Sequence, residues 1–144
     1  MKDIKGDYER GVFSVIVLGI VFDTKERKIL IGKRKPDEHI KELTWAFPGG
    51  MPEYKENLEE SIKREVKEET NLDVESLGAV FAKVYPEKED LLAIYYLCEV
   101  TGNIKNQKEG EDFTEIKWVD PEELENYFTT SFHPSLKEYI INLK

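Results

Sequence analysis

The sequence predicts an α/β fold in which a mixed sheet is covered by helices. Two observations lead to this prediction: β-branched apolar runs bounded by turn residues recur along the chain, and segments of helical period lie between and after them. The chain has 144 residues, 40% of them apolar, and shows no internal repeat or linker. We therefore expect residues 1–144 to form a single domain around one core.

The first two strands are expected at residues 12–22 and 28–35, on either side of the polar turn DTKERK. Almost every side chain in the first run, VFSVIVLGIVF, is apolar, which is typical of a strand buried on both faces in the middle of a sheet. This run is too short to cross a bilayer.

After Pro36 and a polar connection, the segment TWAFPGG predicts a short strand that enters a loop at Pro48, Gly49 and Gly50. Trp45 and Phe47 alternate along this strand, so their side chains share a face. Two interpretations remain open for them: stacking on a base, and filling the core, which is the more frequent role of such residues.

A helix is predicted over residues 57–70. Asn57 is a favoured N-cap residue, and Glu59 and Glu60 occupy the first turn, where acidic side chains stabilise a helix. Asn71 suits the left-handed conformation that commonly ends a helix.

The rest of the chain predicts strands followed by helices. Residues 72–101 read as two long strands separated by YPEKED, and EIKWVD forms a further strand before Pro121. Pro121 opens a short helix that ends near Phe128. A last helix follows Pro134 and places four apolar residues on one face: Leu136, Tyr139, Ile140 and Leu143.

Composition excludes several classes of function. The net charge of −9, from 30 acidic and 21 basic residues, is the opposite of what binding to long nucleic acid requires. Cys98 is the single cysteine, so a disulfide framework and a four-cysteine zinc site are excluded, and we expect a buried thiol. With no signal-peptide pattern at its start, the chain is expected to be cytoplasmic.

The helix at residues 57–70 carries the strongest functional signal. Leu58, Ile62 and Val66 define its apolar face, and on the same helical wheel Glu65 and Glu69 fall within that face. Buried carboxylates need compensating positive charge. Three acids, Glu65, Glu68 and Glu69, exceed what one arginine can neutralise, which favours a hard divalent cation such as Mg²⁺. The alternative is a charged surface helix stabilised by i,i+4 pairs.

Residues 50–72, GMPEYKENLEESIKREVKEETNL, weigh in favour of the metal site. Gly50 is followed after five residues by Glu56, and after seven more by Arg64-Glu65-Val66, then by Glu68-Glu69. This spacing resembles the Nudix box, the signature of the Nudix hydrolases. The one departure is Asn71, where the family has glycine; asparagine tolerates the left-handed backbone, so we expect an intact site.

The resemblance implies a Nudix-type α/β/α sandwich around a mixed sheet, and an enzyme that cleaves a diphosphate linkage with Mg²⁺ or Mn²⁺. By this similarity the metal ligands are Glu65, Glu68, Glu69 and the carbonyl of Gly49. Arg64 would orient Glu65, and Glu56 would brace the loop and helix.

A general base is also implied, and Glu65 is the first candidate. The loop KEGEDFTE offers four others from which the sequence does not choose: Glu109, Glu111, Asp112 and Glu115. The residues expected to line the substrate site are Gly50, Trp45, Phe47 and Glu111.

The function that this resemblance implies is a MutT-like pyrophosphohydrolase acting on a nucleoside triphosphate, oxidised nucleotides included, or on a nucleoside diphosphate derivative. Hydrolysis of ADP-ribose is the first alternative, because some family members with that activity carry a proline downstream of the box, where this chain has Pro86. A non-catalytic nucleotide-sensing domain is the second. The partner is thus a small nucleotide, and the oligomeric state, a homodimer included, stays open.

Overall fold

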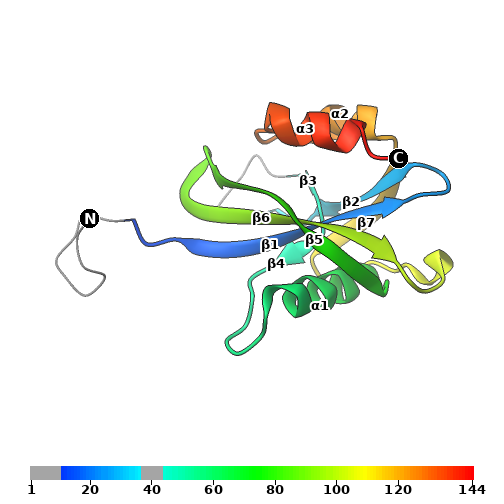
Figure 1. Ribbon diagram of the computed structural model, residues 1–144, viewed down its shortest axis with the longest axis horizontal. Helices are drawn as coiled ribbons and strands as arrows, with labels where there is room; N and C mark the ends of the chain where they lie inside the picture. Colours follow the sequence, from blue (N-terminus) through cyan, green and yellow to red (C-terminus); the bar gives the residue numbers. More distant parts are fainter. Residues whose placement is uncertain (1–10, 37–43) are drawn as a thin grey trace.

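The computed structural model describes residues 11–36 and 44–144, so the polar connection expected after Pro36 lies mostly outside the described residues. Figure 1 shows the elements in chain order. They are β1 (Ser14–Asp23), β2 (Lys28–Arg34), β3 (Trp45–Ala46), β4 (Gly49–Gly50), α1 (Leu58–Thr70), β5 (Val74–Tyr85), β6 (Lys88–Val100), the 3₁₀ helix η1 (Ile104–Asn106), β7 (Phe113–Val119), the 3₁₀ helix η2 (Pro121–Glu123), α2 (Leu124–Tyr127) and α3 (Pro134–Ile141).

The sheet is mixed and has β1 near its centre. The strands follow the order β3-β2-β1-β6-β5, while β4 pairs with β1 and β7 pairs with β2. β1 runs parallel to β6, from Ser14 beside Leu91 to Phe22 beside Glu99, and antiparallel to β2 and β4. The prediction of a first strand buried in mid-sheet is therefore confirmed.

Helices cover both faces of this sheet. In Figure 1, α1 lies on one side of it, and α2 and α3 lie on the other. One apolar cluster joins the sheet to α2 and α3 through Leu124, Leu136 and Ile140. The other joins the opposite face to α1 through Ile62 and Val66. The predicted α/β/α sandwich is confirmed.

Several boundaries differ from the expected ones. β6 begins at Lys88, because Tyr85 pairs with Lys88 and closes the hairpin around Pro86 and Glu87, so the YPEKED connection is a tight turn. β7 begins at Phe113 rather than Glu115, since Phe113 pairs with Arg34 of β2. α3 ends at Ile141, which leaves Leu143 beyond the helix although it still packs against the core.

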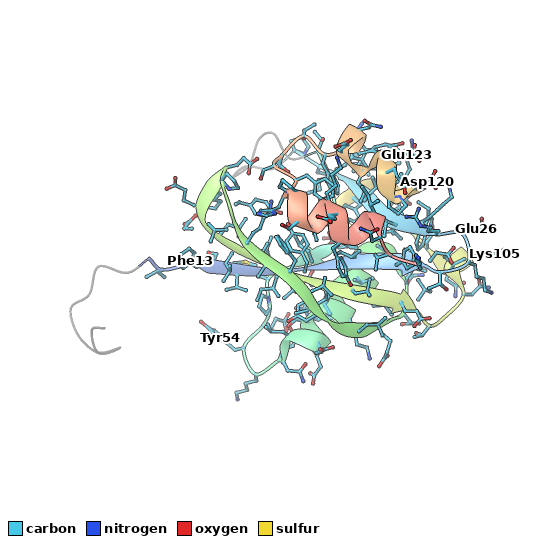
Figure 2. The ribbon with its side chains drawn as sticks, turned by 45° about the horizontal axis from the view of Figure 1, so that its top comes forward. Phe13, Glu26, Tyr54, Lys105, Asp120 and Glu123 are labelled. Carbon is cyan, nitrogen blue, oxygen red and sulfur yellow. The ribbon has the colours of Figure 1, made fainter. Side chains whose placement is uncertain are left out.

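The short helix after β7 starts at the predicted proline. The Asp120 backbone N–H donates to the Glu123 carboxylate at 3.2 Å, and both side chains lie together in Figure 2. No helix within residues 11–36 and 44–144 has the length and apolar character needed to cross a membrane.

Candidate active site

Helix α1 begins and ends as the sequence predicts. The Asn57 side-chain oxygen accepts from the Glu60 N–H at 2.8 Å, which caps the first turn. Asn71 adopts the left-handed conformation with φ of 61°, and its N–H donates to the Lys67 carbonyl at 2.9 Å. Its side chain also donates to the Asn106 carbonyl at 2.8 Å. Asparagine thus forms the helix end where the motif has glycine.

The three glutamates of α1 occupy different environments. Glu65 and Glu69 are buried, at 9% and 2% exposed, whereas the Glu68 side chain is 56% exposed. The Glu69 carboxylate accepts from the Gly49 N–H at 2.6 Å through Oε1, while Oε2 has no hydrogen-bond partner among the residues that the structure describes. The helical wheel therefore placed Glu65 and Glu69 correctly.

Burial raises the pKa of Glu69 to about 8, although the Gly49 N–H and the charge of Arg34 act in the opposite direction; the nearby carboxylates of Asp112 and Glu65 raise it further. The pKa of Glu65 is also raised, chiefly by burial. Both acids lie where a positive charge would stabilise the ionised form.

Arg64 links the loop before α1 to the glutamates on the helix. Its Nε donates to Glu56 Oε2 at 2.7 Å, and its Nη1 donates to Glu65 Oε1 at 2.8 Å and to Glu68 Oε1 at 3.2 Å. These are the contacts that the orienting role of Arg64 requires. Hydrogen bonds from Arg64 and Ser61 lower the pKa of Glu56 to about 2, so this carboxylate stays ionised.

Strand β4 brings the glycine pair against α1. Gly50 pairs with Val17 of β1, and a Cβ atom added at Gly50 would lie 2.4 Å from Glu65 Oε2. Any side chain at this position would displace the carboxylate. Glycine is required here because the strand passes directly over Glu65.

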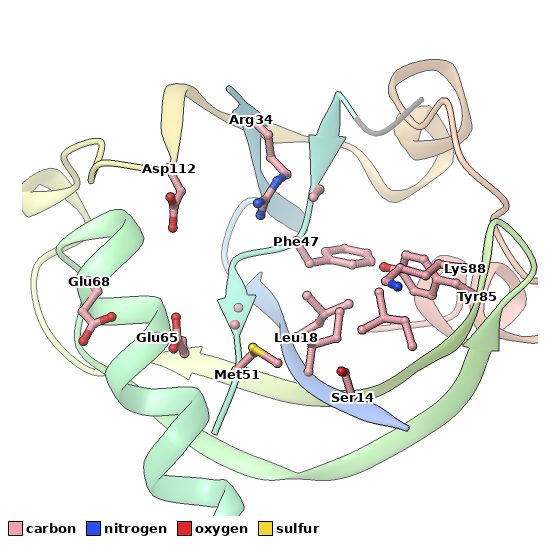
Figure 3. A pocket seen from close by; sticks show the side chains of 15 residues that line it. Ser14, Leu18, Arg34, Phe47, Met51, Glu65, Glu68, Tyr85, Lys88 and Asp112 are labelled. Atoms are coloured by element: carbon pink, nitrogen blue, oxygen red, sulfur yellow. The ribbon is translucent and has the colours of Figure 1, made fainter. Parts of the chain in front are cut away.

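A cavity of about 560 Å³ opens beside these carboxylates, a volume within the range of small-molecule sites. Figure 3 shows Glu65, Glu68 and Asp112 on one side of it and Tyr85 and Lys88 on the other. The remaining residues that line it are Ser14, Ile16, Leu18, Arg34, Ala46, Phe47, Gly49, Gly50, Met51 and Leu91. The cavity thus has a carboxylate side and an apolar, aromatic side.

Of the expected substrate-site residues, Gly50 and Phe47 line this cavity, whereas Trp45 and Glu111 do not. Trp45 packs edge-on against Tyr127, with ring centroids 5.3 Å apart, and belongs to the core beneath α2 and α3. Phe47 does line the cavity, but it is 4% exposed and its other contacts include Phe128. The core-filling interpretation therefore accounts for Trp45, and Phe47 serves both the core and the cavity wall.

Of the four acids in the loop 108–115, Asp112 is the one that lines the cavity, and Glu111 does not. The loop is fixed to the end of α1 because the Lys108 N–H donates to the Thr70 carbonyl and the Gly110 N–H donates to the Glu69 carbonyl, both at 2.9 Å. A Cβ atom at Gly110 would lie 2.1 Å from the Glu68 carbonyl oxygen. Gly110 was therefore the sequence signal that could have indicated the close contact of this loop with the end of α1.

The carboxylate side fits a hard cation in its chemistry. Within the described ranges, no three Asp, Glu, His or Cys side chains are gathered as a ready-made metal cluster. Glu65 and Glu68 are both paired with Arg64. Nevertheless, Glu69 Oε2 is a buried carboxylate oxygen without a donor, and three further carboxylates (Glu65, Glu68 and Asp112) line the adjacent wall. Carboxylate oxygens are the ligands that Mg²⁺ and Mn²⁺ prefer.

Comparison with known proteins identifies the class. Residues 12–141 match the NUDIX domain. The 8-oxo-dGTP diphosphatase of Buchnera aphidicola is 32% identical over 130 residues, which cover 90% of this chain and 92% of that protein. The ADP-ribose pyrophosphatase of Methanocaldococcus jannaschii is 35% identical over 112 residues, 74% of this chain and 62% of that protein.

Solved structures of MutT and Nudix proteins share the fold of this chain. The crystal structure of a MutT protein from Methanosarcina mazei Go1 superposes with a TM-score of 0.74 over 93% of this chain and 96% of that chain, at 20% identity. A Nudix hydrolase from Nitrosomonas europaea gives a TM-score of 0.73 over 92% of this chain and 72% of that chain, at 22% identity. The chain belongs to the Nudix family of hydrolases. The family resemblance and the enzyme class predicted from the sequence are therefore confirmed.

Proposed function

We propose that this protein hydrolyses a diphosphate linkage in a small nucleotide bound in the cavity beside α1. The observation that carries the proposal is the buried Glu69 carboxylate, whose Oε2 has no hydrogen-bond donor among the described residues. Glu69 lies behind the wall of the cavity, and its helix neighbours Glu65 and Glu68 line that wall. Burial of this acidic group in its ionised form is costly unless a cation compensates its charge.

Mg²⁺ is the proposed metal, and Mn²⁺ an acceptable substitute. Glu65, Glu68, Glu69 and the Gly49 carbonyl would hold it. A cation bound there neutralises phosphate oxygens and lowers the pKa of a coordinated water.

The chain's own groups then position and deprotonate the water. Glu65 is the proposed base, since burial raises the pKa of its carboxyl and Arg64 fixes one oxygen at 2.8 Å. Of the four loop acids that the sequence left open, Asp112 is the proposed second candidate, because it lines the cavity and the other three do not. Arg34, also in the lining, is placed to contact a phosphate oxygen.

The proposed substrate is a nucleoside triphosphate, an oxidised one included, or a related nucleoside diphosphate derivative. Water adds across a P–O–P bridge, so a triphosphate cleaved between its α and β phosphorus atoms yields a nucleoside monophosphate and pyrophosphate. Support comes from the relative named 8-oxo-dGTP diphosphatase, which matches this chain over nearly its whole length.

ADP-ribose is the second candidate substrate. One relative is named ADP-ribose pyrophosphatase, and Pro86 lies in the hairpin turn between Tyr85 and Lys88, both of which line the cavity. The downstream proline noted in the sequence is thus close to the site.

We further propose that residues 1–144 act as one domain. We also propose that the enzyme works in the cytoplasm, where thiols such as that of the single cysteine stay reduced.

The test is product analysis by chromatography after incubation of the full chain and Mg²⁺ with canonical nucleoside triphosphates, 8-oxo-dGTP and ADP-ribose in turn. Monophosphate with pyrophosphate from a triphosphate is the expected result. AMP with ribose 5-phosphate from ADP-ribose alone would transfer the assignment to the second candidate. Absence of turnover from every compound, with nucleotide binding intact, would overturn the proposal in favour of a sensing domain.

A further inference from the structure

The side of the cavity that faces away from the carboxylates is apolar, with a small number of polar groups. Its apolar lining includes Ile16, Leu18, Phe47 and Leu91, and its polar side chains are those of Ser14, Tyr85 and Lys88. In Figure 3, Lys88 and Tyr85 lie across the cavity from Glu65 and Glu68. If the diphosphate lies against the carboxylates, the base at the other end of the nucleotide reaches this side.

The hydrogen-bonding capacity of these polar groups differs. The hydroxyls of Ser14 and Tyr85 can donate or accept, so they do not discriminate between a carbonyl and an amino group. The Lys88 ammonium can only donate. It is therefore the polar group on this side of the cavity whose chemistry restricts what lies opposite.

Lys88 acts as a hydrogen-bond donor more than as a site of net positive charge. Its Nζ lies 2.7 Å from Asp90 Oδ1, a contact that uses one of the three N–H groups and balances the charge. A second phosphate group would be repelled by the nearby Asp90 carboxylate. A neutral carbonyl oxygen, by contrast, accepts a hydrogen bond without needing uncompensated positive charge.

The position of Lys88 is fixed by the hairpin. Lys88 begins β6 directly opposite Tyr85 of β5. The turn between them is held from outside, because the Glu87 carboxylate accepts from the Ser131 N–H at 2.6 Å and from the Ser131 hydroxyl at 2.9 Å. The turn fixes the backbone from which the Lys88 side chain extends, and the contact with Asp90 Oδ1 limits where its Nζ lies.

We propose that Lys88 is a specificity-determining residue that favours bases with a ring carbonyl over bases with an amino group at the same position. Guanine, hypoxanthine, uracil and thymine present an oxygen that accepts from Lys88, whereas adenine and cytosine present a second donor and leave both groups unpaired. This inference rests on the proposed function, because it assumes that the diphosphate lies at the carboxylates. It names keto-bearing nucleotides as the substrate class.

The first test measures binding, so that it does not depend on turnover. Calorimetric titration compares IMP with AMP and UMP with CMP, two pairs in which a carbonyl replaces an amino group at one ring carbon. We expect the keto member of each pair to bind the wild-type protein about tenfold more tightly. In Lys88→Met the ratio falls to about twofold or less, and in Lys88→Arg, which keeps the donors, the preference persists.

Lys137→Met is the matched control, because Lys137 is also paired with an acid, Glu125, but does not line the cavity. Its keto preference should equal that of the wild type. Equal binding of IMP and AMP to the wild-type protein, or an unchanged ratio in Lys88→Met, would overturn the inference.

A second test separates this inference from the proposed function. Steady-state kinetics with dITP and dATP should show that Lys88→Met raises KM for dITP while kcat stays within about twofold, as expected for lost ground-state binding. Turnover of both triphosphates with equal kcat/KM in the wild type would support the hydrolase and refute the role of Lys88. A keto preference in binding without any turnover would support the role of Lys88 and refute the hydrolase.

Discussion

Burial of the Glu69 carboxyl couples the protonation state of this single residue to the stability of the fold. Its carboxyl is 2% exposed, accepts one hydrogen bond from Gly49 and has a pKa raised from 4.5 to about 8. A group whose pKa is higher in the folded state takes up a proton on folding. Its contribution to stability is therefore complete below pH 4.5 and is lost as the pH rises to about 8.

We predict that ionisation of Glu69 lowers the stability of the folded protein as the pH rises. Without divalent cations, the free energy of unfolding should fall between pH 5 and 8, and Glu69→Gln, which keeps the acceptor for Gly49, should reduce that fall by about 2 to 4 kcal/mol. Urea unfolding in EDTA at several pH values measures it. Parallel pH profiles for the two proteins would contradict the prediction. The raised pKa of Glu65 leaves part of the slope in the variant.

Asn71 is a second residue whose role can be tested alone, because it stands where the family motif has glycine. Its φ of 61° and its side-chain bond to the Asn106 carbonyl act together. We expect Asn71→Ala to lower the free energy of unfolding by about 1 to 2 kcal/mol, and Asn71→Gly to cost less, since glycine adopts this backbone without strain. Urea unfolding distinguishes the two variants. Equal stability of Asn71→Ala and the wild type would show that the left-handed backbone imposes no penalty here.

At the scale of elements, the site depends on a loop far from the helix in sequence. Residues 108–112 dock on the end of α1 through the Gly110 N–H, and this docking carries Asp112 to the cavity wall. The contact is close, since a methyl group at Gly110 would meet the Glu68 carbonyl at 2.1 Å. The position of Asp112 therefore depends on the absence of a side chain two residues earlier.

Two substitutions test the contribution of this loop. Gly110→Ala should displace the loop and lower kcat by about tenfold, and Asp112→Asn should give a loss of similar size if the carboxylate itself takes part. Glu111→Gln is the matched control, because Glu111 does not line the cavity. Steady-state rates with Mg²⁺ provide the measurement. Full activity in both Gly110→Ala and Asp112→Asn would exclude the loop from the reaction.

In the whole molecule, one sheet joins two apolar cores, one on each face, where the sequence predicted a single core. Trp45 packs against the core under α2 and α3, and Trp118 packs against the core under α1. The same central strand contributes to both, since Leu18 and Ile20 face the first core and Val17 and Val21 face the second. Loss of one core should therefore destroy the other.

We predict that the chain unfolds as a single cooperative unit. Trp45→Phe and Trp118→Phe each leave one tryptophan, which reports on one face of the sheet. In each variant, the urea midpoint measured by tryptophan fluorescence should equal the midpoint measured by far-UV circular dichroism within the experimental error. A fluorescence midpoint distinct from the dichroism midpoint in either variant would indicate two separately stable layers and contradict the single domain.

The sequence predicted local features well because their causes are local. Helical period placed Glu65 and Glu69 on the buried face, and the end residues Asn57 and Asn71 were identified by their own side-chain and backbone preferences. Cavity membership was harder to predict. Whether Asp112 or Glu111 lines the cavity depends on docking between segments about 40 residues apart in sequence. Lys88 lies near the cavity because β6, from Leu91 on, runs parallel to β1, and no periodicity in the sequence encodes that pairing.

We propose that the carboxylates of α1 make the protein a metal-dependent hydrolase. The most direct measurement is the initial rate of hydrolysis against Mg²⁺ concentration for the wild type, Glu65→Gln, Glu69→Gln and the control Lys137→Met, each checked for folding by thermal unfolding. We predict rates that require Mg²⁺, that are unchanged in Lys137→Met, and that fall by about 100-fold or more in both glutamine variants. Wild-type rates in folded Glu65→Gln and Glu69→Gln, or rates independent of the cation, would contradict the claim.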